Sequence, residues 1–106
     1  MKNGLYAVSF ISNQQDNGGG VISIRDGALN GGDTGYTYQG TIKEGKTTLQ
    51  VKQHDNQVIS VFEITGDFDV DLDFRDTEEG FEAEGNVQGE QELAIKIRGK
   101  YISALV

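Results

Sequence analysis

One short stretch, from Asp67 to Arg75, constrains the fold of this chain more than any other part of its sequence. Asp67, Asp69, Asp71 and Asp73 alternate there with Phe68, Val70, Leu72 and Phe74. Successive side chains of a β-strand point to opposite faces, so an extended chain places the carboxylates on one face and the apolar groups on the other. A helix would scatter both kinds of residue around its axis. The stretch therefore predicts a strand with one face on a core and the other in solvent.

Similar two-residue alternation recurs along the chain between glycine-containing turns, and no segment shows a helical period of 3.6 residues. Such alternation leaves one solvated face per strand, which is typical of antiparallel sheets. Together with the aspartate-rich stretch we expect about eight short strands, in a meander that closes as a barrel or a sandwich. The other extended segments that we expect are 5–12, 21–25, 28–33, 36–42, 47–54, 58–64, 81–87 and 93–98.

Glycines mark the expected turns. Asp26-Gly27 is a pair that suits a tight type I′ turn between two strands. Gly31-Gly32-Asp33 predicts a turn in which the aspartate bonds back to the chain. The run from Gly18 to Gly20 lacks the lysine and serine or threonine of a phosphate-binding loop, so we interpret it as a hairpin loop or bulge.

The length of 106 residues predicts one domain, spanning residues 1–106. The sequence contains no cysteine, which excludes disulfides and thiolate chemistry and fits a cytoplasmic protein. The apolar run from Leu5 to Val8 is too short for a signal peptide, and no stretch approaches the length needed to span a bilayer. We therefore expect a protein of the cytoplasm with no membrane contact.

The formal net charge is −8, and it is distributed unevenly. Residues 1–53 contain five Lys and Arg against four acids, whereas residues 54–106 contain four against thirteen. Strong negative charge repels the phosphates of DNA and RNA, so we expect no direct contact with nucleic acid. Any control of genes would then act through another protein.

Catalysis and metal binding are both disfavoured by the residue pattern. The single histidine, His54, has Asp55 and Ser60 near it in sequence, but nothing indicates a nucleophile elbow. The aspartates from Asp67 onward, with Glu78, share the spacing of a calcium loop, but Leu72 replaces its required glycine. We therefore expect no enzyme activity, metal or other cofactor.

Aromatic residues on the inward faces have two interpretations. Most sets of this kind form core packing, but an eight-stranded barrel can also hold one small ligand. In the second case tyrosine hydroxyls would orient an apolar guest. The residues that we predict to line such a cavity are Tyr6, Phe10, Tyr36, Tyr38, Phe62 and Phe68.

Several short motifs carry a family resemblance through most of the chain, strongest from Met1 to Gly40. The chain resembles the GrlR-type negative regulators of type III secretion genes in bacteria. The motifs are Met1-Lys2-Asn3-Gly4-Leu5-Tyr6, Phe10-Ile11-Ser12-Asn13, Gly20-Val21, Gly31-Gly32-Asp33, Tyr38-Gln39-Gly40 and Ser60-Val61-Phe62.

This resemblance implies a lipocalin-like, eight-stranded antiparallel barrel, often dimeric, that binds and restrains a transcriptional activator. It also implies that an acidic loop after the Tyr-Gln-Gly motif contacts the activator. Here that loop reads Lys43-Glu44-Gly45-Lys46, so only Glu44 carries over as a contact residue.

Two hypotheses follow. In the first, the protein is a regulator, homodimeric as the resemblance implies, whose acidic surface binds an activator. The residues predicted to contact that activator are Glu44, Asp67, Asp69, Asp71 and Asp73, with Glu82 and Glu84 as further candidates. In the second, the barrel carries or senses a small apolar molecule, and Tyr36 and Tyr38 lie near it.

Overall fold

The structure is a computed structural model, and it describes residues 1–14, 17–58 and 66–106. All of its regular elements are β-strands, and none of the described residues lies in a helix. The strands are β1 (Gly4–Ser12), β2 (Asn17–Arg25), β3 (Ala28–Gly32), β4 (Tyr36–Thr41), β5 (Lys46–Gln53), β6 (Phe68–Asp76), β7 (Gly80–Val87) and β8 (Glu90–Ser103).

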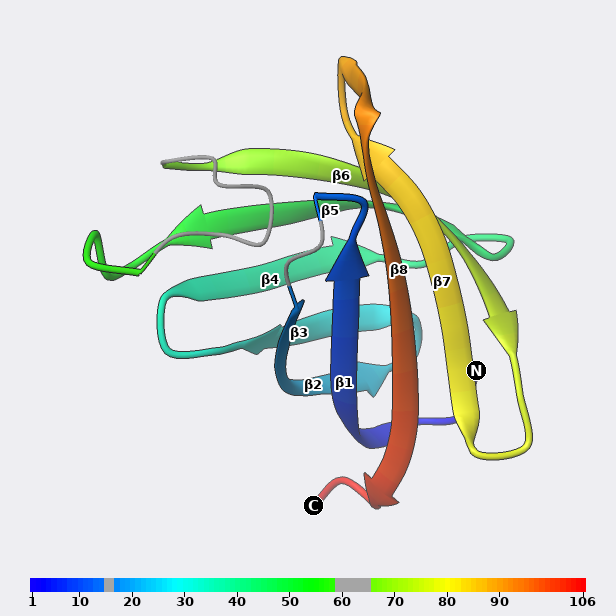
Figure 1. Cartoon of the computed structure of the whole chain (residues 1–106). Coiled ribbons are helices and arrows are strands. Elements are labelled where there is room, and N and C mark those ends of the chain that lie inside the picture. The colour runs from blue at the N-terminus through cyan, green and yellow to red at the C-terminus, as the bar shows by residue number, and fades with distance from the viewer. Residues whose placement is uncertain (15–16, 59–65) are drawn as a thin grey trace.

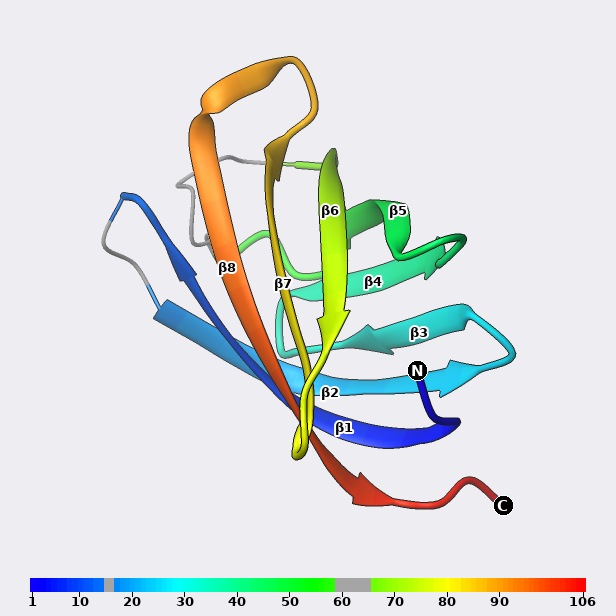
Figure 2. The same cartoon turned by 90° about the vertical axis from the view of Figure 1, so that its right-hand side faces the viewer.

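These strands form a closed antiparallel barrel in which each pairs with its neighbours in chain order and β8 pairs with β1 (Figure 1). The expected eight-stranded meander barrel is confirmed, and it is consistent with a lipocalin-like fold. The β7–β8 hairpin extends beyond the neighbouring strands (Figure 2). Each of the eight described strands pairs with a neighbour on both sides over part of its length.

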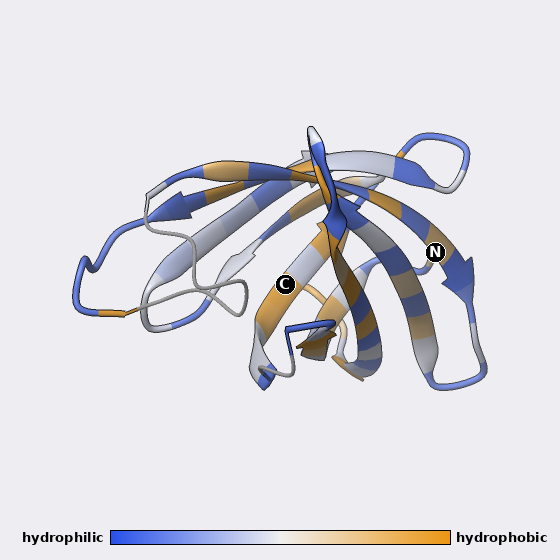
Figure 3. Cartoon of the chain, turned by 45° about the horizontal axis from the view of Figure 1, so that its top comes forward, coloured by the Kyte–Doolittle hydropathy of each residue, from blue (hydrophilic) through white to orange (hydrophobic). Residues whose placement is uncertain are grey.

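The alternation that predicted β6 is confirmed by its burial. Val70 and Leu72 are buried, whereas Asp73 is exposed and Asp71 is only partly covered. Figure 3 shows the same pattern as bands of hydrophobic and hydrophilic residues that alternate along the strands. The calcium-like spacing therefore belongs to an extended strand, which holds neighbouring carboxylates of one face about 6.6 Å apart.

Two hairpins turn tightly through residues with positive φ. Asp26 and Gly27 have φ values of 51° and 84°, as a type I′ turn between β2 and β3 requires. Glu44 and Gly45, with values of 53° and 78°, connect β4 to β5 in the same way. The first of these turns was predicted from its Asp-Gly pair.

Two predictions about local structure need correction. The glycines from Gly18 to Gly20 lie within β2 and pair with β1, so they are not a hairpin loop. Because glycine has no side chain, the ring of Phe10 can lie against Gly18, where a Cβ would collide with it. The expected strand 58–64 is wrong at Val58, which lies in a bend, and residues 59–64 lie outside the described residues.

One end of the barrel is filled by well-packed side chains. Tyr6, Ile24 and Phe81 are at most 1% exposed, and the rings of Tyr6 and Phe81 meet edge to face with centroids 5.4 Å apart. The Tyr6 hydroxyl donates a hydrogen bond to the carbonyl of Lys2. Burial, and secondarily the nearby Asp76, raises the pKa of Tyr6.

Among the described residues there is no helix whose length and apolar character would let it cross a membrane.

Candidate functional site

The other end of the barrel contains a cavity of about 300 Å³. The backbone of β2 forms part of its wall at Gly18 and Gly19, and Gly18 lies opposite Phe10 of β1. Further along β2, the buried side chain of Ile22 also lines the cavity. The cavity walls come from most strands and are mainly apolar, including Val8, Leu29, Leu49, Val51, Val70, Leu72, Ile95 and Ile97.

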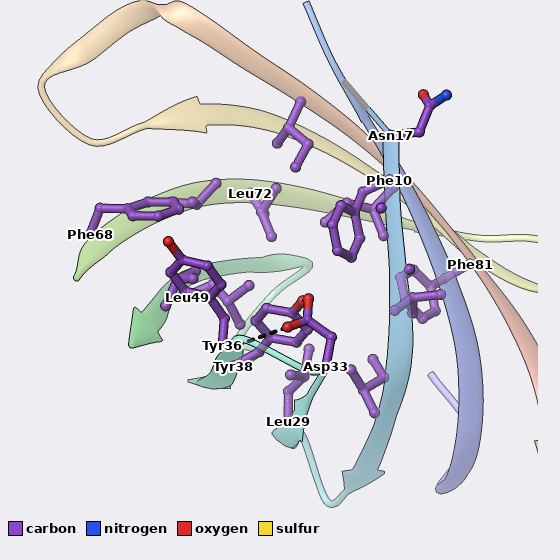
Figure 4. A pocket seen from close by; sticks show the side chains of 18 of the residues that line it. Phe10, Asn17, Leu29, Asp33, Tyr36, Tyr38, Leu49, Phe68, Leu72 and Phe81 are labelled. Carbon is purple, nitrogen blue, oxygen red and sulfur yellow. Dashed lines mark hydrogen bonds between the residues drawn. The ribbon is translucent and has the colours of Figure 1, made fainter. Parts of the chain in front are cut away.

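Aromatic side chains form much of the cavity wall. Phe10 of β1 and Tyr38 of β4 meet edge to face, with ring centroids 6.0 Å apart. Tyr36 and Phe68 form a second such pair across β4 and β6 at 6.1 Å. Figure 4 shows the rings of Phe10 and Tyr38 projecting into the same interior space. The structure thus brings together four of the residues that the sequence singled out for a cavity.

The other two residues from that prediction do not join this group. Tyr6 packs against Tyr101 and against Phe81, which itself lines the cavity, but Tyr6 is not among the lining residues. Phe62 lies outside the described residues. Sequence alternation assigns Tyr6 to the inward face, but it does not reveal which end of the barrel is hollow.

A polar cluster at the β3–β4 turn borders the cavity. The Asp33 carboxylate accepts hydrogen bonds from the backbone N–H groups of Gly35 (2.9 Å) and Tyr36 (2.8 Å). These bonds confirm that Asp33 holds the turn. The carboxylate also accepts a hydrogen bond from the Tyr38 hydroxyl, drawn in Figure 4. Burial, followed by this bond and the charge of Asp33, strongly raises the pKa of Tyr38.

The pairing of Asp33 with Tyr38 was not predicted from the sequence. The turn between β3 and β4 is short, and Gly31 of β3 pairs with Tyr38 of β4. This pairing brings the Tyr38 side chain close to Asp33. The spacing of five residues around a predicted turn was a usable signal. Asp33 is the only acidic or basic side chain among the described residues that line the cavity.

The outer surface of β6 and β7 carries a second candidate site, which we call the acidic face. It consists of Asp69, Asp71, Asp73, Glu82 and Glu84. Strand pairing sets these residues in cross-strand rows, and Asp73 lies directly opposite Glu84. The β6–β7 pairing therefore joins in space acids that are separated in the sequence.

Local cations neutralise part of the acidic face. Lys46 of β5 lies 3.2 Å from the Asp73 carboxylate, and Arg75 lies 2.6 Å from that of Glu82. Asp71 instead accepts a 2.9 Å hydrogen bond from the hydroxyl of Thr48. Within the described part of the chain, neither Asp71 nor its neighbour Asp69 forms an ion pair. Glu84 also forms no ion pair there, so Asp69, Asp71 and Glu84 are the carboxylates of the acidic face without an ion pair among the described residues.

The remaining predicted contact residues lie beside this face. Asp67 precedes β6, and its carboxylate accepts a 2.9 Å hydrogen bond from the backbone N–H of Gln53. Glu44 is exposed in the β4–β5 turn, which is joined to β6 by a 2.7 Å bond from the N–H of Phe74 to the Gly45 carbonyl. Glu44 therefore lies near the Asp73 end of the acidic face.

A second hollow, of about 610 Å³, borders the acidic face. Its lining has mixed charge, with carboxylates from β6 and β7 and cations from β6 and β8. The charged residues that line it are Asp73, Arg75, Glu82, Glu84, Lys96 and Arg98. A partner at this hollow would need charges of both signs, whereas one at Asp69 and Asp71 would need positive charge.

The candidates for catalysis are not assembled. His54 is exposed, and its Nε2 lies 3.0 Å from the backbone carbonyl oxygen of Asp33. The Asp55 carboxylate accepts a hydrogen bond from the N–H of Gln57, and Ser60 lies outside the described residues. Across the described ranges, no group of three or more His, Asp or Glu side chains is placed to hold a metal ion.

Comparison with known proteins adds one finding. A family model described as "T3SS negative regulator, GrlR" matches residues 1–105, nearly the whole chain. A search of the curated proteins found no match. The match agrees with the motifs in the first part of the sequence and with the closed barrel. This chain therefore belongs to the GrlR family of negative regulators of the type III secretion system.

Proposed function

We propose that this protein lowers the expression of type III secretion genes by binding a transcriptional activator through its acidic face. The observation that carries the proposal is the pair Asp69 and Asp71. They lie on one strand of a closed barrel, and neither forms an ion pair among the described residues. A closed barrel keeps such side chains in fixed relative positions, so little ordering is needed when a partner binds.

The chemistry of the partner follows from this charge. A transcriptional activator must bind DNA, and DNA-binding surfaces are rich in Lys and Arg. An acidic surface on a protein of net charge −8 attracts such a surface and can occupy it in place of DNA. Repression then requires no chemistry on the activator, and the protein acts in the bacterial cytoplasm as a non-enzymatic binding protein.

The test is repression in cells of the host bacterium that lack this gene and carry a reporter for type III secretion genes. We expect the wild-type protein to lower reporter output and the charge reversal Asp69→Lys with Asp71→Lys to lose most of that effect. The control is Glu78→Lys with Glu79→Lys, which makes the same charge change at exposed positions before β7. It should repress like the wild type.

The outcomes separate the family function from the proposed surface. Equal repression by the Asp69 and Asp71 variant and the wild type would refute the acidic face as the contact site. Loss of repression in both charge-reversed variants would show that total charge matters and not this face. Failure of the wild-type protein to repress would refute the regulatory role itself.

The cavity supports a second candidate function, binding or sensing of a small apolar molecule. Its volume of about 300 Å³ and its apolar wall are those of a small ligand site. Native mass spectrometry of freshly purified protein should show an additional bound mass, which unfolding releases. A ligand could also change the affinity for the activator, because binding at two sites of one protein can be coupled.

A further inference from the structure

We propose that the cavity selects an amphiphilic organic cation, with an apolar body inside the barrel and an ammonium group at Asp33. This inference rests on the second candidate function, because it specifies the chemical class of the ligand. Asp33 is the only acidic or basic side chain in the described cavity wall. Among the described residues of the wall, a charged group that enters the cavity therefore meets one negative charge and no positive one.

The position of this charge is fixed by three donors. Gly35 and Tyr36 bind the carboxylate through backbone N–H groups, and Tyr38 binds it through its hydroxyl. A carboxylate has about four lone-pair sites, so it can still accept from one further donor. The Tyr38 oxygen has lone pairs of its own. Both groups can accept a hydrogen bond from an ammonium group.

Aromatic rings surround the same place. Phe10 contacts Tyr38 edge to face, and Tyr36 follows Asp33 in the turn, with its N–H on the carboxylate. Ring faces attract cations, more strongly where water is excluded, and such surroundings are typical of sites for organic ammonium ions. Figure 4 shows Asp33 among these rings, whereas Asn17 points away from them.

Anionic amphiphiles should be excluded by the same features. A fatty carboxylate would place its charge near Asp33, in a cavity where few water molecules can screen the repulsion. The net charge of −8 adds to this barrier during approach. Neutral amphiphiles should bind with an affinity between those of the cationic and anionic ones, since they gain the apolar contacts alone.

The experiment compares octylammonium, octanol and octanoate, three molecules with the same apolar chain and different head groups. Each is titrated into the ¹⁵N-labelled protein at pH 7, and binding is followed by NMR shifts of the Gly35 and Tyr36 amides. We expect octylammonium to bind at least about tenfold more tightly than octanol, and octanoate to bind most weakly. Equal affinities, or the reverse order, would overturn the proposal.

Two matched variants locate the effect. Asp33→Asn keeps an acceptor for the turn and removes the charge, so it should abolish the preference for octylammonium over octanol. Asp69→Asn removes a charge from the outer surface, and the preference should persist. Preference that survives Asp33→Asn but is lost with Asp69→Asn would place the cation outside the barrel and refute the site.

Failure of the proposal can be distinguished from failure of the ligand-binding function. If octanol shifts the cavity amides and octylammonium binds no better, the cavity binds apolar molecules without selecting a cation. If none of the three molecules shifts these amides, both the cation site and the ligand-binding function are refuted.

Discussion

Replacing Tyr38 by phenylalanine should destabilise the fold at neutral pH and remove part of its sensitivity to alkali. The side chain is 7% exposed, and its hydroxyl donates to the Asp33 carboxylate. Hydrogen bonds to charged groups contribute about 1.5–3 kcal/mol. For a chain of this size, the loss should lower Tm by roughly 10 °C at pH 7. Phenylalanine keeps the ring contact with Phe10, so the loss reports mainly on the hydroxyl.

The dependence on pH has a defined sign. Because the folded state raises the pKa of Tyr38, the unfolded chain releases this proton at a lower pH than the folded protein does. The stabilisation is therefore complete below the unfolded pKa of about 10 and is lost as the pH rises above it. The loss is at most about 1.4 kcal/mol per pH unit for one group. Tyr6 should add a similar dependence, since its pKa is also raised.

The assay is urea unfolding of the wild type and Tyr38→Phe between pH 7 and pH 11.5. Subtracting one free energy of unfolding from the other removes contributions from lysines and from Tyr6, which both proteins share. The difference should be largest at pH 7 and should shrink steadily above about pH 10. A difference that stays constant across this range, or one below about 0.5 kcal/mol at pH 7, would refute the account of Asp33 and Tyr38.

Three further substitutions test the packing and the surface. Ile24→Ala removes a fully buried side chain and should cost about 2–5 kcal/mol in urea unfolding; a cost near zero would contradict the close packing of that end. Gly18→Val should displace the ring of Phe10 and cost about 1–3 kcal/mol, with altered ring signals in NMR spectra; unchanged signals would show that the ring does not lie over Gly18. Lys46→Ala breaks an ion pair whose lysine is 76% exposed, so thermal unfolding should report a loss below about 1 kcal/mol, and a larger loss would mean that the pair is not screened by solvent.

The fold was largely predictable because local signals agree with the global structure. The alternation from Asp67 to Arg75 predicted β6, and the Asp26-Gly27 pair predicted the turn between β2 and β3. Each signal acts over a few residues, where side-chain direction and backbone φ are decided. Closure of the barrel depends on long-range pairing of β8 with β1, and the family resemblance supplied that expectation.

The glycines of β2 show where local reasoning fails. Three consecutive glycines are typical of a loop, yet they lie in β2, and the ring of Phe10 on the adjacent strand occupies the space that a side chain at position 18 would need. Only the register between β1 and β2 reveals this contact. The cavity was for that reason predicted from its aromatic residues, and the part of its wall formed by Gly18 and Gly19 was not.

The candidate sites were predictable in part. Alternation assigns Asp69, Asp71 and Asp73 to one outward face, but it does not reveal that Lys46 pairs with Asp73 and leaves the other two uncompensated. The role of Asp33 as a turn-forming acceptor was predicted, whereas its bond to Tyr38 needed the geometry of the β3–β4 turn.

The most direct test of the proposed mechanism is the dissociation constant for the activator that the wild-type protein captures from its host. Calorimetry at low and moderate salt would compare the wild type, Asp69→Lys with Asp71→Lys, and the control reversal at Glu78 and Glu79. The mechanism predicts affinity that falls with salt and is weakened at least about tenfold by the first reversal but little changed by the control. Equal affinity of all three proteins for the activator would contradict it.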